Sequence, residues 1–200
     1  MDSAVIWYAG QATGIVCLVL FSIVMVLGIG VRRQVRLPGM PRLAAVALHR
    51  SISLLAVAFL TVHILTAVAD SYVDISPLAA VAPFSSSYEP LWVGLGTVAL
   101  DLILAVTVTS LLRARLGRRT WRAVHWLAYG CWPAAVVHGV ALGSGTGHAM
   151  NGWALGLTLG CVAVVLATTA HHFLAGRRRV TQTQTQIQTP ADLLAAGARR

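Results

Sequence analysis

Two apolar stretches of this 200-residue chain each contain a pair of histidines. His49 and His63 are fourteen residues apart, and His125 and His138 are thirteen residues apart. An ionisable side chain is unfavourable in hydrocarbon, so histidines within apolar segments usually bind a ligand or form part of a transfer pathway. Imidazole nitrogens are also common metal ligands. The spacing therefore favours ligand-binding histidines over four unrelated core histidines.

The composition predicts the elements that hold these histidines. The chain is 57% hydrophobic and 10% charged, which leaves too few polar residues to cover a soluble surface. Its apolar stretches approach the ~20 residues with which a helix crosses ~30 Å of hydrocarbon. A spanning chain must satisfy its backbone hydrogen bonds internally. We therefore predict an all-α membrane protein with five transmembrane helices near residues 5–30, 43–69, 91–112, 121–143 and 152–175.

The arginines predict the orientation of these helices. All fifteen basic residues are arginines, and they follow the first, third and fifth stretches, whereas the segments 70–90 and 144–151 contain none. By the positive-inside rule, the N-terminus lies outside and the C-terminus in the cytoplasm of a multi-pass protein of the cell membrane. Arg32 and Arg33 follow the first stretch, which predicts an anchor rather than a cleaved signal peptide. The net charge of +9 then reflects topology and no nucleic-acid binding.

This topology sorts the histidines into two levels. His49 adjoins Arg50 and His125 follows Arg122 by three residues, so both lie near the cytoplasmic face. The other two histidines precede the outer segments by six or seven residues. At ~1.5 Å per residue, the levels are about 20 Å apart. Each level suits a haem with two axial imidazoles, and two such haems would form an electron path. Zinc fits less well, because a structural zinc site needs four clustered ligands.

The thirteen-residue spacing is less simple to explain. Fourteen residues of a helix return to within about 40° of the same face, whereas thirteen miss it by about 140°. Pro133 lies between His125 and His138 and removes a backbone hydrogen bond. A kink at this proline is the expected means of turning the second histidine.

Longer motifs carry a family resemblance. The segments "HRSISLLAVAFLTVH" and "HWLAYGCWPAAVVH", with one helix between them, resemble the ferric reductase-like transmembrane domain shared by NADPH oxidases and the haem subunit of bacterial methionine sulfoxide reductase. The segments "SYEPLWVGLGTVAL" and "TSLLRARLGRRTWRAVHWLAY" resemble its bacterial members. The resemblance covers residues 5–175. It implies two haems b, the inner one held by His49 and His125 and the outer one by His63 and His138.

The resemblance also implies a role as the haem subunit of an oxidoreductase. The sequence contains no GxGxxG motif, so FAD, FMN or a quinone is expected only through a partner. Apart from membrane lipid, the implied partners are a flavoprotein or quinol donor inside and a redox protein or metal-ion acceptor outside. One alternative is a quinol-oxidising cytochrome b. Another is a small transporter or assembly factor whose histidines handle protons or metal.

The polar residues and glycines outside the two histidine pairs have less specific expected roles. Arg50 and Arg122, and also Arg119, would either pair with haem propionates or only anchor the topology. Asp101, in the middle of the third stretch, would orient a histidine or pair with a Ser or Thr. Gly152, Gly156 and Gly160 predict a close-packing helix face. His148 would be an exposed loop residue, and His171 and His172 would lie at the interface. Residues 1–175 form the predicted haem-binding domain, and 176–200 a disordered cytoplasmic tail.

Overall fold

The computed structural model describes residues 3–32, 41–70, 73, 75–145 and 152–197, with side chains for 5–32, 41–70, 73, 75–143 and 152–175. These residues contain helices and no strand, so the chain is all-helical, as the composition predicts. The helices are α1 (Ser3–Arg32), α2 (Arg42–Ala69), α3 (Pro90–Leu111), α4 (Arg118–His125), α5 (Ala128–Gly145) and α6 (Gly152–Gly197).

Four helices are long and apolar enough to cross a membrane. They are Val5–Arg32, Arg42–Ala69, Pro90–Leu111 and Gly152–Ala175. These four correspond to the first, second, third and fifth stretches that the sequence predicts. The fourth stretch is divided between α4 and α5. The protein is therefore a multi-pass membrane protein built from apolar helices.

The division between α4 and α5 falls at Trp126 and Leu127. Here the backbone N–H groups of Leu127, Tyr129 and Gly130 donate to the carbonyls of Val124, Trp126 and Leu127, at 2.9, 3.0 and 2.9 Å. These bonds span three residues instead of four, so the chain tightens over one turn. Each residue of such a turn advances about 120° rather than about 100°. The extra rotation moves the residues of α5 toward the face that carries His125.

The kink expected at Pro133 is therefore not the only means of turning His138. Pro133 lies inside α5, and the helix continues through it. The tightened turn six residues earlier contributes rotation in the required sense, about 20° for each of its residues. Trp126 and Leu127 suit a continuous apolar helix, which is why the sequence did not reveal this turn.

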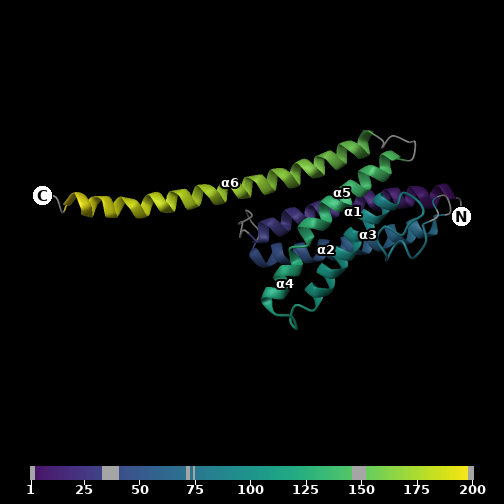
Figure 1. The fold of residues 1–200 in the computed structure, drawn as a ribbon, viewed down its shortest axis with the longest axis horizontal. Coiled ribbons are helices and arrows are strands. Elements are labelled where there is room, and N and C mark those ends of the chain that lie inside the picture. The colour runs from purple at the N-terminus through teal and green to yellow at the C-terminus, as the bar shows by residue number, and fades with distance from the viewer. Residues whose placement is uncertain (1–2, 33–40, 71–72, 74, 146–151, 198–200) are drawn as a thin grey trace.

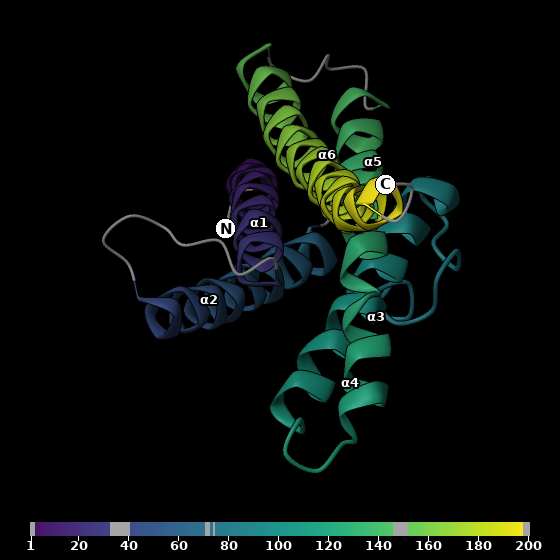
Figure 2. The ribbon, with the colours of Figure 1, turned by 90° about the vertical axis from the view of Figure 1, so that its left-hand side faces the viewer.

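The helices form two groups. α1 and α2 run antiparallel and pack along their lengths, while α3 packs against α5 and α4. Figure 1 shows both groups from the side, and Figure 2 shows the α3–α4 end projecting away from α2. α1 also contacts α5 and α6, so it joins the two groups.

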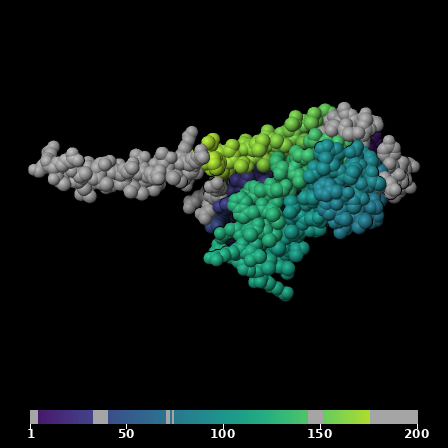
Figure 3. Space-filling view, viewed as in Figure 1, coloured from purple at the N-terminus to yellow at the C-terminus, as the bar shows by residue number. Residues whose placement is uncertain are grey.

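The segment 75–89 covers one half of α3. The Thr97 hydroxyl of α3 donates to the Ala79 carbonyl at 2.7 Å. The Phe84 ring lies over Gly94, where a Cβ would come within 2.2 Å of it. In the space-filling view this blue segment lies flush against the bundle (Figure 3). Glycine at position 94 thus permits the close contact that fixes the segment on α3.

α6 differs from the sequence-based expectations in two ways. Its backbone continues as a helix to Gly197, through the tail for which composition predicts disorder, and it extends beyond the bundle in Figure 1. Propagating an existing helix requires only one fixed residue per new hydrogen bond, which favours this extension. In addition, no described atom lies within 4 Å of a Cβ placed on Gly152, Gly156 or Gly160. The glycine face that was predicted to pack closely therefore has no packing neighbour among the described residues.

Candidate functional site

The four histidines meet as two pairs across the two helix groups. His63 of α2 and His138 of α5 have ring centroids 6.5 Å apart, with the ring planes at 84°. His49 of α2 and His125 of α4 have centroids 6.4 Å apart, with the planes at 66°. These are the pairings that the sequence predicts from depth along the helices.

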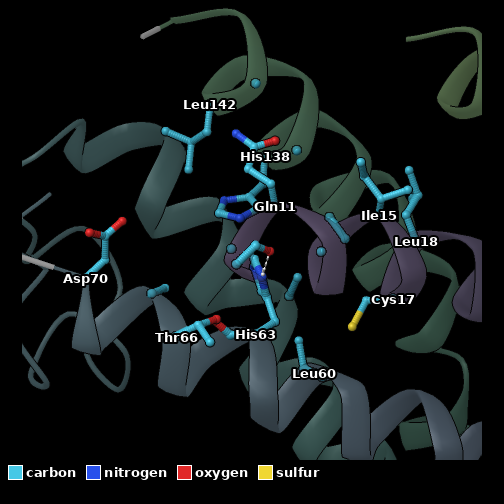
Figure 4. Close-up of a pocket in the computed structure, with 18 of the residues that line it drawn as sticks. Gln11, Ile15, Cys17, Leu18, Leu60, His63, Thr66, Asp70, His138 and Leu142 are labelled. Carbon is cyan, nitrogen blue, oxygen red and sulfur yellow. Dashed lines mark hydrogen bonds between the residues drawn. The ribbon is translucent and has the colours of Figure 1, made fainter. Parts of the chain in front are cut away.

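Backbone carbonyls fix both rings of the His63–His138 pair. His63 Nδ1 lies 2.9 Å from the Gly10 carbonyl oxygen, and His138 Nδ1 lies 2.8 Å from the Trp92 carbonyl oxygen. A carbonyl can only accept, so each Nδ1 carries the proton and donates. Each Nε2 is therefore the nitrogen with a free lone pair. Figure 4 shows both rings entering one pocket, with the His63 hydrogen bond dashed.

Glycines let the neighbouring helices approach these rings closely. A Cβ on Gly14 would lie 3.0 Å from His63 Cε1, and one on Gly96 would lie 2.5 Å from His138 Cε1. A Cβ on Gly28 would lie 3.3 Å from His49 Cε1. Three of the four rings therefore lie against a glycine of another helix. Sequence reasoning missed these glycines.

The pocket between His63 and His138 has a volume of about 250 Å³. Its lining comes from α1, α2, α3, α5 and α6, together with residues of the segment between α2 and α3, and is mainly apolar. Besides the two histidines, its polar members include Gln11, Thr66 and the buried Asp70, which Figure 4 labels, and also Tyr88 and Thr158. Such a pocket suits a flat apolar group with a polar margin, bound between two imidazoles.

The His49–His125 pair is held differently. The Nδ1 atoms of both rings are buried and have no hydrogen-bond partner within the described residues. The indole of Trp121 stacks on the His125 ring, with centroids 5.1 Å apart and planes at 28°. Buried nitrogens without partners are costly unless a bound group uses the imidazole.

Between the two pairs, a buried hydrogen bond joins the helix groups. Trp132 Nε1 of α5 donates to Ser22 Oγ of α1 at 3.0 Å. Both residues are buried, and Trp132 lies about midway between His125 and His138 in sequence. This contact fixes α5 against α1 at a depth between the histidine levels.

The other predicted site residues lie outside the two pairs. Arg50, Arg119 and Arg122 have exposed side chains. Asp101 is also exposed, on the surface of α3, so it does not pack against a histidine. The rings of His171 and His172 contact each other on α6 at 5.3 Å. His148 lies outside the described residues.

The ring separations limit the kind of ion that each pair can share. Two collinear metal–nitrogen bonds of about 2.0–2.1 Å, together with the ring radii, put the centroids about 6–6.5 Å apart, whereas a tetrahedral ion gives about 5 Å. The observed separations of 6.4 and 6.5 Å fit the collinear case. No group of three or more His, Cys, Asp or Glu side chains suited to a metal occurs among the described residues.

Comparison with protein families agrees with this geometry. Residues 13–136 match the family model of the ferric reductase like transmembrane component. The chain belongs to this family. Domains of the family generally bind haem, and membership makes the protein a membrane redox component for electron transfer. The matched segment contains His49, His63 and His125 and ends two residues before His138. No curated protein and no solved structure matches the chain.

Proposed function

We propose that this ferric reductase-like protein is a di-haem b subunit that passes single electrons across the cytoplasmic membrane. His49 and His125 bind the inner haem, and His63 and His138 bind the outer haem. The observation that carries the proposal is the near-equal separation of the two ring pairs, 6.4 and 6.5 Å, which suits axial ligands on one iron. The crossed ring planes are compatible with this, since both planes can contain the same axis.

The chain's own groups orient the ligands. At the outer site the Gly10 and Trp92 carbonyls hold the Nδ1–H groups, so each Nε2 points into the pocket. Such hydrogen bonds fix the tautomer of a ligating histidine and increase its basicity. The mainly apolar lining disfavours water at this site. A bound haem supplies a one-electron iron couple, whose potential the axial ligands and burial tune.

The two sites together cross most of the membrane. The fourteen residues between His49 and His63 on α2 separate the levels by about 20 Å. In the proposed topology α5, with α4 at its cytoplasmic end, forms the fourth of five crossings, the N-terminus is outside and the C-terminus is in the cytoplasm. This orientation rests on the arginines, which the positive-inside rule assigns to the cytoplasm.

The proposed partners follow from the two faces. A separate flavoprotein or a quinol delivers electrons at the cytoplasmic level, and an external redox protein or metal ion accepts them. The chain thus acts as the haem subunit of an oxidoreductase. Arg50 and Arg122 adjoin the inner level with exposed side chains, and so can meet haem propionates or the donor.

The decisive experiment is to count haems in the purified protein. We expect a reduced-minus-oxidised spectrum with a sharp low-spin alpha band and close to two haems b per chain by pyridine haemochrome analysis. His63→Leu or His138→Leu should remove the outer haem only, and His49→Leu or His125→Leu the inner one. His171→Leu is the matched control and should keep both. A colourless preparation from haem-replete cells would exclude the proposal.

A further inference from the structure

Three of the four histidine rings are held by one arrangement. His63, His138 and His49 each lie against a glycine of a neighbouring helix, namely Gly14, Gly96 and Gly28. At the outer site, the carbonyl four residues before that glycine accepts the Nδ1 hydrogen bond. A glycine and its preceding turn thus form a socket for the imidazole. Because this socket consists of backbone atoms, it fixes the ring without a contact from any other side chain.

His125 lacks this socket. It is the last residue of α4, an eight-residue helix that ends at the tightened turn before α5. Its Nδ1 is buried without a hydrogen-bond partner in the described structure. In place of a glycine and a carbonyl, its ring meets the Trp121 indole at 5.1 Å, with the planes at 28°. Residues four apart share one face of a helix, so α4 itself brings the two rings together.

Trp121 is in turn fixed by the end of α3 and by the segment that follows it. Its Nε1–H donates to Ser110 Oγ at 3.4 Å. The Arg113 guanidinium carbon lies 5.5 Å from the centroid of a Trp121 ring, a cation–π distance. The indole is therefore held on two sides while its face rests on His125. An indole anchored in this way restricts the rotation of the imidazole.

We propose that Trp121 is the positioning residue of the inner haem ligand His125, and that its stacking takes the place of the glycine contact that the other three imidazoles have. The proposal rests on the proposed function, because it takes His125 as an axial ligand. Trp121 acts through His125 and need not touch the haem. It follows that removal of the Trp121 indole should weaken the bond between His125 and the inner haem.

The test compares Trp121→Leu with Trp121→Phe in the full-length purified protein. Leucine removes the aromatic face, whereas phenylalanine keeps a smaller aromatic face without the N–H that bonds Ser110. Trp126→Leu is the matched control, since Trp126 is a neighbouring exposed indole that contacts Arg32 rather than a histidine. Haem content and carbon monoxide binding by the dithionite-reduced protein are measured for each variant. Carbon monoxide binds only where an axial ligand has been displaced.

The wild type and Trp126→Leu should contain two haems and bind no carbon monoxide. Trp121→Leu should bind carbon monoxide at up to half of its haem, or lose one haem of the two. Trp121→Phe should restore the wild-type result. Trp121→Leu that behaves as wild type would overturn the proposal, and so would Trp121→Phe that is as defective as Trp121→Leu. A wild-type protein without haem would instead refute the proposed function.

Discussion

At the scale of single residues, the histidines depend on backbone atoms of helices far away in sequence. The carbonyls that hold His63 and His138 belong to Gly10 and Trp92. The close approach of these helices to the rings depends on Gly14 and Gly96, because a Cβ at either position would meet an imidazole. A Cβ on Gly96 would lie only 2.5 Å from His138 Cε1, closer than real Cβ atoms come. A larger residue at position 96 would therefore force the His138 ring or α3 to shift.

Gly96→Ala should accordingly impair the outer haem site. Overpacking by one methyl group in a filled interior costs about 1–3 kcal/mol, and here it pushes His138 off its carbonyl. We expect a protein that contains one haem instead of two by pyridine haemochrome analysis, with the inner haem spectrum unchanged. Gly156→Ala on α6 is the control, since no described atom lies within 4 Å of its Cβ. Two fully occupied haems in Gly96→Ala would contradict the argument.

The sequence alone predicted the histidines but not their supports. Histidine is rare in apolar helices, so four of them at matched depths are a visible signal. A backbone carbonyl leaves no mark in the sequence. The glycines left a weaker mark, because Gly14 and Gly28 are fourteen residues apart, like His49 and His63 in the antiparallel helix. That match becomes meaningful only once α1 is known to pack on α2.

At the scale of elements, the structure differs from the sequence prediction at the break between α4 and α5. The apolar stretches predicted α1, α2, α3 and the membrane part of α6 closely, because length and hydropathy suffice for a spanning helix. The break at Trp126 and Leu127 was not predicted, since both residues suit a continuous apolar helix and Pro133 was the stronger signal. A tertiary contact lies at this position: the Arg32 guanidinium carbon of α1 is 4.0 Å from the Trp126 ring centroid.

The hydrogen bond from Trp132 to Ser22 is the buried side-chain link between α5 and α1. Ser22→Ala leaves the indole N–H without its acceptor in the interior, which costs about 1–3 kcal/mol. The midpoint of thermal unfolding in detergent should fall by about 2–4 °C for each kcal/mol lost. Trp153→Phe alters an indole that is 64% exposed and should leave the midpoint unchanged. Equal midpoints for Ser22→Ala and the wild type would show that this link does not join the helices.

At the scale of the whole molecule, the helix contacts and the arginine distribution give different information about the orientation of the chain in the membrane. The contacts arrange the helices relative to one another, but they do not say which end faces the cytoplasm. The arginines supply that direction: Arg113 and Arg115 follow α3, whereas the segment 70–90 between α2 and α3 has no basic residue. The bias sets topology in short loops because basic residues are retained on the cytoplasmic side. The direction of electron flow depends on this assignment.

Cysteine labelling tests the orientation directly, in a background that lacks the free cysteines Cys17, Cys131 and Cys161. Val81→Cys is suitable for the outer face because Val81 is 72% exposed, whereas the nearby Ser86 is buried. Ala114→Cys, at an exposed position between two arginines, reports the opposite face. An impermeant maleimide should label Val81→Cys in intact cells and Ala114→Cys only after permeabilisation. The reverse pattern would exchange the inner and outer haems. A cytoplasmic donor would then have to deliver electrons at the His63–His138 pair instead of the His49–His125 pair.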